Sequence, residues 1–170
     1  YIWSGIDVSG PSMTYATRPT MVNGTYTPLV GDYDGDGCDD VFWYAPGRCE
    51  DHIWYNDGGS TFTSKPVTVN GSYRPVVNYF NGDDTTDIYW YAPGATAESL
   101  WVANTNRTVT SVRAPQVNGD YLPMPFMPNV VLWYGPGRAP DSITWFEAGN
   151  TAAQGNLTTV IDPTFRAVPF

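Results

Sequence analysis

The chain has 170 residues, of which 42% are hydrophobic and 15% aromatic, and it contains 17 Gly and 15 Pro. Gly and Pro leave few segments as long as the ~11 residues of an average helix, which excludes a helical bundle, and the aromatic content excludes a disordered tail. The net charge of -9 argues against nucleic acid and anionic membranes as partners. No apolar run approaches the ~20 residues that span a bilayer, so we expect no membrane insertion.

The first 21 residues open with Tyr1-Ile2-Trp3, and this Ile-Trp pair has counterparts later in the chain, at Ile53-Trp54 and Leu100-Trp101. The opening run therefore resembles the third strand of a repeating unit. Because residue 1 is not Met, we expect a mature processed form or a piece of a longer protein.

A repeat of 47 to 48 residues then organises the chain. Val-Asn-Gly-Thr-Tyr-Thr-Pro at 22–28 returns in similar form at 69–75 and 117–123, and Phe-Trp-Tyr-Ala-Pro-Gly at 42–47 returns at 89–94 and 132–137. A third block aligns Ile53-Trp54 with the longer Ile143-Thr144-Trp145. The repeats are therefore approximately 22–68, 69–116 and 117–160.

Each repeat contains four short runs of apolar or aromatic residues with turn residues between them. In the first repeat the predicted strands are 26–32, 40–45, 52–56 and 62–69, with Pro46-Gly47 in the turn between the second and the third. Four strands in about 40 to 50 residues are typical of one propeller blade. We predict an all-β fold, with 1–170 as a single propeller domain.

The last ten residues, 161–170, align with a first strand. Together with 1–21 they are predicted to form a fourth, split blade that lacks an obvious second strand. Such a shared blade hides open sheet edges. Either the chain is incomplete, or a second copy or a larger parent chain supplies the missing strand.

The segment between the first two predicted strands of the first repeat is an acidic, glycine-containing loop, residues 32–40. Its positions 1, 3, 5, 7 and 9 offer the carboxylates of Asp32, Asp34, Asp36 and Asp40 and the backbone carbonyl of Cys38. Hard oxygen ligands in this number suit Ca²⁺. The alternative is a solvated acidic turn, but four crowded carboxylates repel one another unless a cation neutralises them.

The corresponding loop of the second repeat has fewer charged ligands. It offers Asn81, Asp83 and Asp87 together with the backbone carbonyl of Thr85, so we predict a second, weaker Ca²⁺ site. In the third repeat the spacing from Val117 to Trp133 is 16 residues, against 21 from Val22 to Trp43. The loop is five residues shorter there, and we expect no metal in it.

The acidic loop, the apolar strand after it and the Ala-Pro-Gly turn resemble the FG-GAP/VCBS repeats of integrin α-subunits and of many secreted bacterial proteins. The resemblance implies a calcium-binding β-propeller that works outside the cell in adhesion or ligand binding. The tryptophan-rich repeats are also, more loosely, similar to those of bacterial propeller lectins.

Binding is favoured over catalysis. Seven Trp and twelve Tyr offer stacking platforms for a glycan or an extracellular protein, although aromatic residues that recur in register also pack between blades. His52 is the single histidine and stands where the other repeats have Ser99 and Ser142, so we interpret it as structural. A hydrolase would need paired acids; Asp51, Glu98 and Asp141 recur in every repeat and are interpreted as hairpin caps.

The sequence leaves three alternatives. The first is a secreted, non-catalytic, Ca²⁺-stabilised binding module, with lectin-like or adhesive activity. The second is a structural propeller that joins copies into a ring or filament through its open blade ends. The third is a polysaccharide-acting hydrolase. Pairing of Cys38 with Cys49 and a polar pocket around Arg48 and Arg138 are left open.

Overall fold

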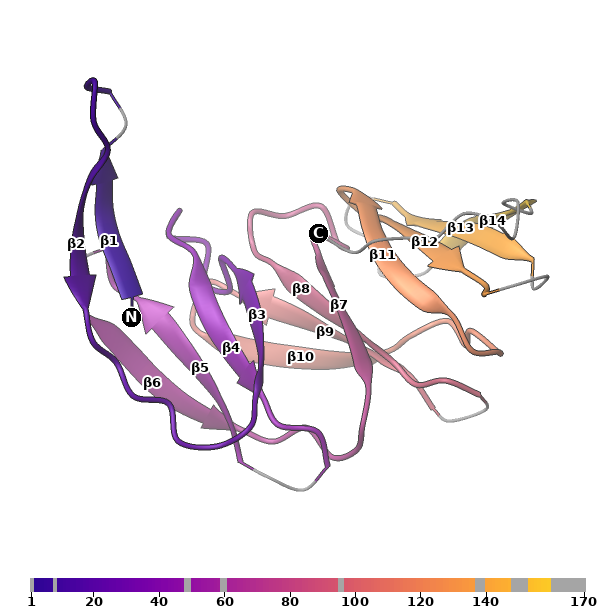
Figure 1. Cartoon of the computed structure of the whole chain (residues 1–170). Coiled ribbons are helices and arrows are strands. Elements are labelled where there is room, and N and C mark those ends of the chain that lie inside the picture. Colours follow the sequence, from indigo (N-terminus) through magenta and orange to yellow (C-terminus); the bar gives the residue numbers. More distant parts are fainter. Residues whose placement is uncertain are drawn as a thin grey trace. The chain divides into compact units, whose positions relative to one another are not determined.

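The computed structural model of the chain describes residues 2–7, 9–47, 50–58, 61–94, 97–136, 140–147 and 153–159. Within these ranges the chain forms strands and turns and no helix (Figure 1). Accordingly, the described residues include no helix of the length and hydrophobicity that crossing a membrane requires. The predicted all-β class is confirmed.

The strands form one hairpin and three four-stranded antiparallel sheets (Figure 1). The hairpin pairs β1 (Ile2–Asp7) with β2 (Thr14–Arg18). The first sheet contains β3 (Thr27–Gly31), β4 (Asp40–Tyr44), β5 (Asp51–Asn56) and β6 (Phe62–Val67). The second contains β7 (Arg74–Asn78), β8 (Asp87–Tyr91), β9 (Ser99–Asn104) and β10 (Thr108–Arg113). The third contains β11 (Leu122–Met127), β12 (Val130–Tyr134), β13 (Asp141–Phe146) and β14 (Ala153–Thr159).

Each sheet is a meander in which the strands lie in chain order, as in a propeller blade. The strands of the first sheet follow the predicted runs to within two residues at every end, because turn residues and alternating side chains specify them locally. Residues 161–170 lie outside the described residues, so the split blade stays a prediction.

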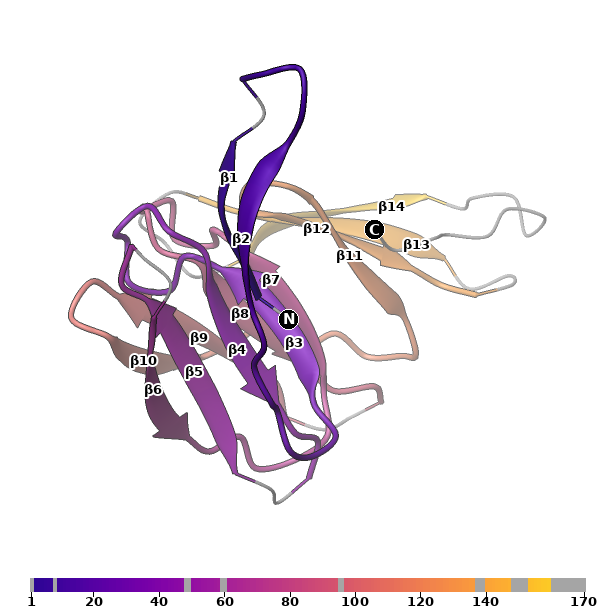
Figure 2. The ribbon, with the colours of Figure 1, turned by 60° about the vertical axis from the view of Figure 1, so that its left-hand side comes forward.

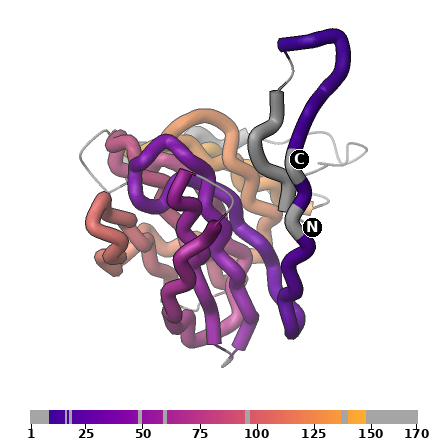
Figure 3. Tube along the Cα trace, turned by 90° about the vertical axis from the view of Figure 1, so that its left-hand side faces the viewer, coloured from indigo at the N-terminus to yellow at the C-terminus, as the bar shows by residue number. Residues whose placement is uncertain are grey.

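The chain divides into two compact units, the first made of residues 1–30 and 38–70 and the second of 31–37 and 71–170. In the first unit, β3 to β6 lie side by side (Figure 2), and the trace passes back and forth through them (Figure 3). Phe42 and Tyr44 on β4 and Ile53 and Tyr55 on β5 are buried. The alternate residues Trp43 and Trp54 occupy the other face and are half-buried.

The core of the second unit joins two blades face to face. Tyr89 and Tyr91 of β8 pack against Trp133 of β12, with ring centroids 5.5 and 5.1 Å from it. Phe80 meets Phe146 at 4.8 Å, and all five side chains are at most 1% exposed. The tyrosine face of the second sheet thus packs on the tryptophan face of the third. For Tyr89, Tyr91 and Trp133 this confirms the predicted packing of recurrent aromatic residues between blades.

The register of β13 corrects one alignment made from the sequence. Trp133 pairs with Ser142, as Trp43 pairs with His52, so the residue in the place of Trp54 is Thr144. Trp145 is one residue further along and is 41% exposed. The Ile-Trp match at Ile143-Thr144-Trp145 was wrong because strand register, rather than residue type, decides which face a side chain occupies.

The acid after each Pro-Gly turn ties strand ends together. Asp51 accepts hydrogen bonds from the backbone N–H groups of Ala45 and Val69, both at 2.7 Å. Asp141 accepts one from Gly135 at 2.8 Å, and Glu98 accepts one from Val117 at 2.9 Å. All three acids are buried. The predicted capping role is confirmed.

Candidate metal centre

The acidic loop follows β3 directly and is organised by its first residue. Oδ1 of Asp32 accepts hydrogen bonds from the backbone N–H groups of Asp34 (3.3 Å), Gly35 (2.6 Å) and Asp36 (3.2 Å), and Oδ2 accepts one from Gly37 (2.8 Å). Gly35 and Gly37 have φ angles of 72° and 87°, a backbone conformation that favours glycine. The loop therefore curls around the Asp32 carboxylate.

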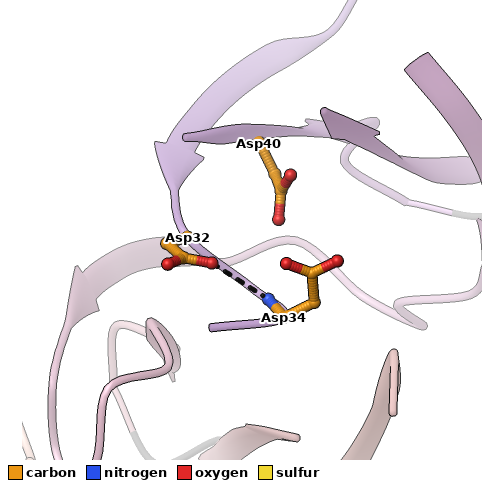
Figure 4. Close-up of side chains that lie close together, drawn as sticks. All are labelled: Asp32, Asp34 and Asp40. Atoms are coloured by element: carbon orange, nitrogen blue, oxygen red, sulfur yellow. Dashed lines mark hydrogen bonds between the residues drawn. The ribbon is translucent and has the colours of Figure 1, made fainter. Parts of the chain in front are cut away.

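Three carboxylates of this loop converge. Asp32, Asp34 and Asp40 each contribute one oxygen to a group whose atoms all lie within 4.8 Å of one another (Figure 4). The three residues are 9%, 6% and 0% exposed. Burial removes water from around like charges, so the group needs cationic compensation.

Part of that compensation comes from Arg107, in the turn between β9 and β10. Its Nε donates a hydrogen bond of 2.6 Å to Oδ2 of Asp34. The other oxygen, Oδ1 of Asp34, is buried and has no hydrogen-bond partner in the structure. A buried carboxylate oxygen in this state is strongly unfavourable in a protein but is what a hard cation binds. The donor set therefore fits Ca²⁺.

Two further ligands were predicted in this loop: the carboxylate of Asp36, and the backbone carbonyl of Cys38, which stays a prediction. Asp36 is exposed and stands outside the three-acid group, and Cys38 is half-buried. Asp40 also connects the loop to β5, because its Oδ1 accepts a hydrogen bond of 2.8 Å from the backbone N–H of Asn56 at the end of that strand. Cys49, Arg48 and Arg138 are outside the described residues, so the suggestions that involve them stay open.

Sequence reasoning missed Arg107. It stands 73 residues after Asp34, in a turn whose sequence resembles any polar hairpin connection. A second long-range contact holds the same loop, since the backbone N–H of Thr86 donates to the carbonyl of Asp32 at 2.6 Å. Neither contact leaves a local signal in the sequence.

The loop of the second repeat is closed by its own hydrogen bonds. The backbone N–H groups of Asp83 and Thr85 donate to the side chains of Asn81 (3.0 Å) and Asp83 (2.8 Å), respectively. Asp87 is buried and accepts the N–H groups of Phe80 (2.9 Å) and Ala103 (3.1 Å). Within the described ranges this loop holds no group of three converging acids.

Asp87 corresponds to Asp40, and each accepts the N–H of the residue at the same point of the third strand, Ala103 and Asn56. Burial raises the pKa of Asp87 to about 7, against the effect of its backbone hydrogen bonds. In the third repeat a tight turn at Pro128 and Asn129 replaces the loop, and Asn129 has a φ of 56°.

Comparison with known proteins gives one match. Residues 24–62 match the family model described as FG-GAP repeat. No curated protein and no solved structure is significantly similar to the chain. The matched stretch includes β3, β4, β5 and the acidic loop. The chain therefore resembles the FG-GAP repeat family over the residues that contain the candidate metal centre.

Proposed function

We propose that this chain is a non-catalytic, Ca²⁺-stabilised binding module of an extracellular protein, with a glycan or a protein as its ligand. The observation that carries the calcium assignment is the buried, unpartnered Oδ1 of Asp34 within the group formed by Asp32, Asp34 and Asp40. Arg107 offsets one negative charge of the three, and a divalent ion offsets the remaining two.

Asp32, Asp34 and Asp40 would hold the ion, and the bound ion would supply electrostatic stabilisation of the loop rather than chemistry. The second loop, with Asn81, Asp83, Thr85 and Asp87, remains a weaker candidate because its side chains are engaged with one another and with backbone N–H groups. The extracellular assignment is supported by the FG-GAP resemblance at 24–62.

The geometry of the recurrent acids supports a non-catalytic role. Asp51, Glu98 and Asp141 each accept hydrogen bonds from backbone N–H groups in the segments that follow strand ends. A hydrolase would instead need two carboxylates facing each other across an accessible cleft. Turnover on a polysaccharide panel with Ca²⁺ present would contradict this part of the proposal.

Thermal unfolding tests the calcium site. An ion that binds only the folded state at about 100 times its Kd stabilises the fold by about 2.7 kcal/mol, which corresponds to a rise in Tm of roughly 5 to 10 °C for a chain of this size. We expect this rise when Ca²⁺ replaces EDTA. Mg²⁺ should have a smaller effect because it demands a tighter octahedral shell.

Two matched variants locate the ion. Asp34→Asn removes one converging charge and should abolish most of the Ca²⁺-dependent rise in Tm. Asp39→Asn changes an exposed acid of the same loop whose known contact is made by its backbone carbonyl, so it should retain the rise. Equal Tm values in Ca²⁺ and EDTA for the unmodified protein, with no heat of binding in calorimetry, would reject the calcium assignment.

A further inference from the structure

The acidic loop begins where the first repeat comes into close contact with the second. Residues 31–37 belong to the first repeat but lie in the second compact unit, together with residues 71–170. Gly31, the last residue of β3, meets Thr86, the residue directly before β8, and both are buried. This contact lies immediately before Asp32, the residue around which the loop curls.

The closeness of Thr86 requires a glycine at position 31. A Cβ atom on Gly31 would lie 2.5 Å from Cγ2, 2.8 Å from Oγ1 and 2.9 Å from Cβ of Thr86, and real Cβ contacts are essentially never shorter than 3.0 Å. Thr86 cannot turn away easily, because its branched side chain has few rotamers and is 2% exposed. Gly31 does not have a positive φ, so the requirement is for space and not for a special backbone conformation.

The close approach brings the two backbones within hydrogen-bond distance. The N–H of Thr86 donates to the carbonyl of Asp32 at 2.6 Å. The carboxylate of Asp32 in turn accepts the backbone N–H groups of residues 34–37, of which Figure 4 draws the bond from Asp34. A contact that fixes the Asp32 peptide therefore also fixes the carboxylate that organises the loop.

The second repeat contacts the loop again at Gly35. A Cβ atom there would lie 3.2 Å from Cγ2 of Thr105 and 3.3 Å from Cγ2 of Thr85. Arg107, two residues after Thr105, holds the Asp34 carboxylate. Residues of the second repeat thus hold the loop at its first residue, at Gly35 and at one of the converging carboxylates.

The junction between the second and third repeats has another residue at the same position. Asn78 stands one repeat length after Gly31, and it ends β7 as Gly31 ends β3. Its side-chain Nδ2 itself reaches the next repeat, where it donates to the carbonyls of Met127 (2.8 Å) and Val130 (3.1 Å). The loop after Asn78 holds no group of three converging acids among the described residues. Direct backbone contact through a glycine is therefore found at the loop whose acids converge.

We propose that Gly31 and Thr86 are positioning residues of the candidate metal centre, and that through them the second repeat sets the Ca²⁺ affinity of the first. This proposal rests on the calcium site proposed above. Neither residue contributes a carboxylate to the site. Their contact holds Asp32 in place before an ion binds, so binding does not have to supply the free energy of ordering the loop.

Calorimetric Ca²⁺ titration of Gly31→Ala tests the contact. The added methyl group should displace Asp32 and weaken Ca²⁺ binding about 10- to 100-fold, the usual effect of changing a residue that orients a metal ligand. Gly10→Ala is the matched control, because the nearest atom to its Cβ would be 3.8 Å away, and its Kd should equal that of the unmodified protein. Each titration is run well below the Tm that the variant shows in EDTA, so that lower stability alone does not change the Kd.

Substitutions of Thr86 separate positioning from a merely structural role. Thr86→Val keeps the branched shape and the backbone N–H and removes a buried hydroxyl that has no hydrogen-bond partner, so the Kd should stay within about twofold. Thr86→Ala removes the two atoms closest to the added methyl group. Combined with Gly31→Ala it should recover most of the lost affinity, and alone it should weaken binding less than Gly31→Ala does. A merely structural contact would change the Tm in EDTA and leave the Kd of all these variants unchanged.

If Gly31→Ala does not fold, Thr86→Ile, which enlarges the other side of the same contact, takes its place and should also weaken Ca²⁺ binding. An unchanged Kd in the variant that enlarges the contact overturns the inference and leaves the calcium site in place, as does a double variant that recovers no affinity. No heat of Ca²⁺ binding by the unmodified protein rejects the calcium site, and the inference is rejected with it.

Discussion

Arg107 shows how one residue from a distant turn can set the properties of the acidic loop. Its guanidinium neutralises part of the charge on Asp34, and it also occupies one of the two carboxylate oxygens of that residue. The same contact that stabilises the loop without metal therefore opposes a bound cation, by charge repulsion and by competition for a ligand atom.

We predict that Arg107→Gln lowers the Tm measured in EDTA and enlarges the rise in Tm caused by Ca²⁺, because the loop loses its internal cation and exposes a stronger negative site. Calorimetry should show tighter Ca²⁺ binding. Arg113→Gln is the control, since it removes the same charge from an exposed position on β10. Identical Ca²⁺ responses of the two variants would show that Arg107 does not tune the site.

Glu98 provides a residue-scale test of pH dependence. Burial raises the pKa of its carboxyl above the ordinary value, although hydrogen bonds from Val117 and Tyr89 oppose the rise. Because the folded protein holds this proton more tightly than the unfolded chain does, the stabilisation is present below about pH 4.3 and is lost as the pH rises through the raised pKa.

Glu98→Gln stays neutral and retains an acceptor, so its Tm relative to the unmodified protein should increase as the pH is raised from about 4 to about 8. Melting curves across that range, at saturating Ca²⁺, measure the difference. Glu147→Gln, at an exposed position, should show no such trend. Parallel pH curves for Glu98→Gln and the unmodified protein would contradict the assigned shift.

At the scale of the element, a blade is closed by the acid at the start of its third strand. Asp51 begins β5, yet it binds the N–H of Ala45 just after β4 and that of Val69 just after β6. One buried carboxylate therefore connects the ends of β4 and β6 with the start of β5, all at the same end of the sheet. This explains why an acid recurs at this position in all three repeats without any need for catalysis.

Asp51→Ala leaves two buried N–H groups without acceptors, and at roughly 1 to 3 kcal/mol for each it should lower the free energy of unfolding by about 2 to 6 kcal/mol. Urea titration measures this loss. Glu50→Ala removes a neighbouring exposed acid and should change stability by less than about 0.5 kcal/mol. Equal effects of the two substitutions would contradict the capping role.

At the scale of the whole molecule, the second unit shows how blades stabilise one another by covering each other's faces. A four-stranded sheet has two apolar faces and cannot bury them alone, as is general for repeat proteins. In the second unit the tryptophan face of the third sheet is covered by Tyr89 and Tyr91, and Trp133 is 0% exposed. In the first unit the equivalent Trp43 is half-buried, and each of the two tryptophans borders a cavity of about 250 Å³. The same repeat position thus holds a fully buried tryptophan in one unit and a half-buried one in the other.

The sequence by itself determined the strands, their grouping into repeats and the position of the acidic loop. These features depend on interactions within a few residues: Pro-Gly turns, alternating side chains, and glycines at positive φ. The capping acids were also predictable, because their offset from the turn is constant.

Only the tertiary structure decided which loop acids converge, which side chain compensates them and where a pocket remains. Asp36 is exposed and outside the converging group, and Arg107 comes from another repeat. Thr144 rather than Trp145 takes the place of Trp54. Each of these outcomes depends on strand register or on packing between segments far apart in the chain. Neither register nor long-range packing leaves a local pattern of residues, so no reading of the repeats alone would have found them.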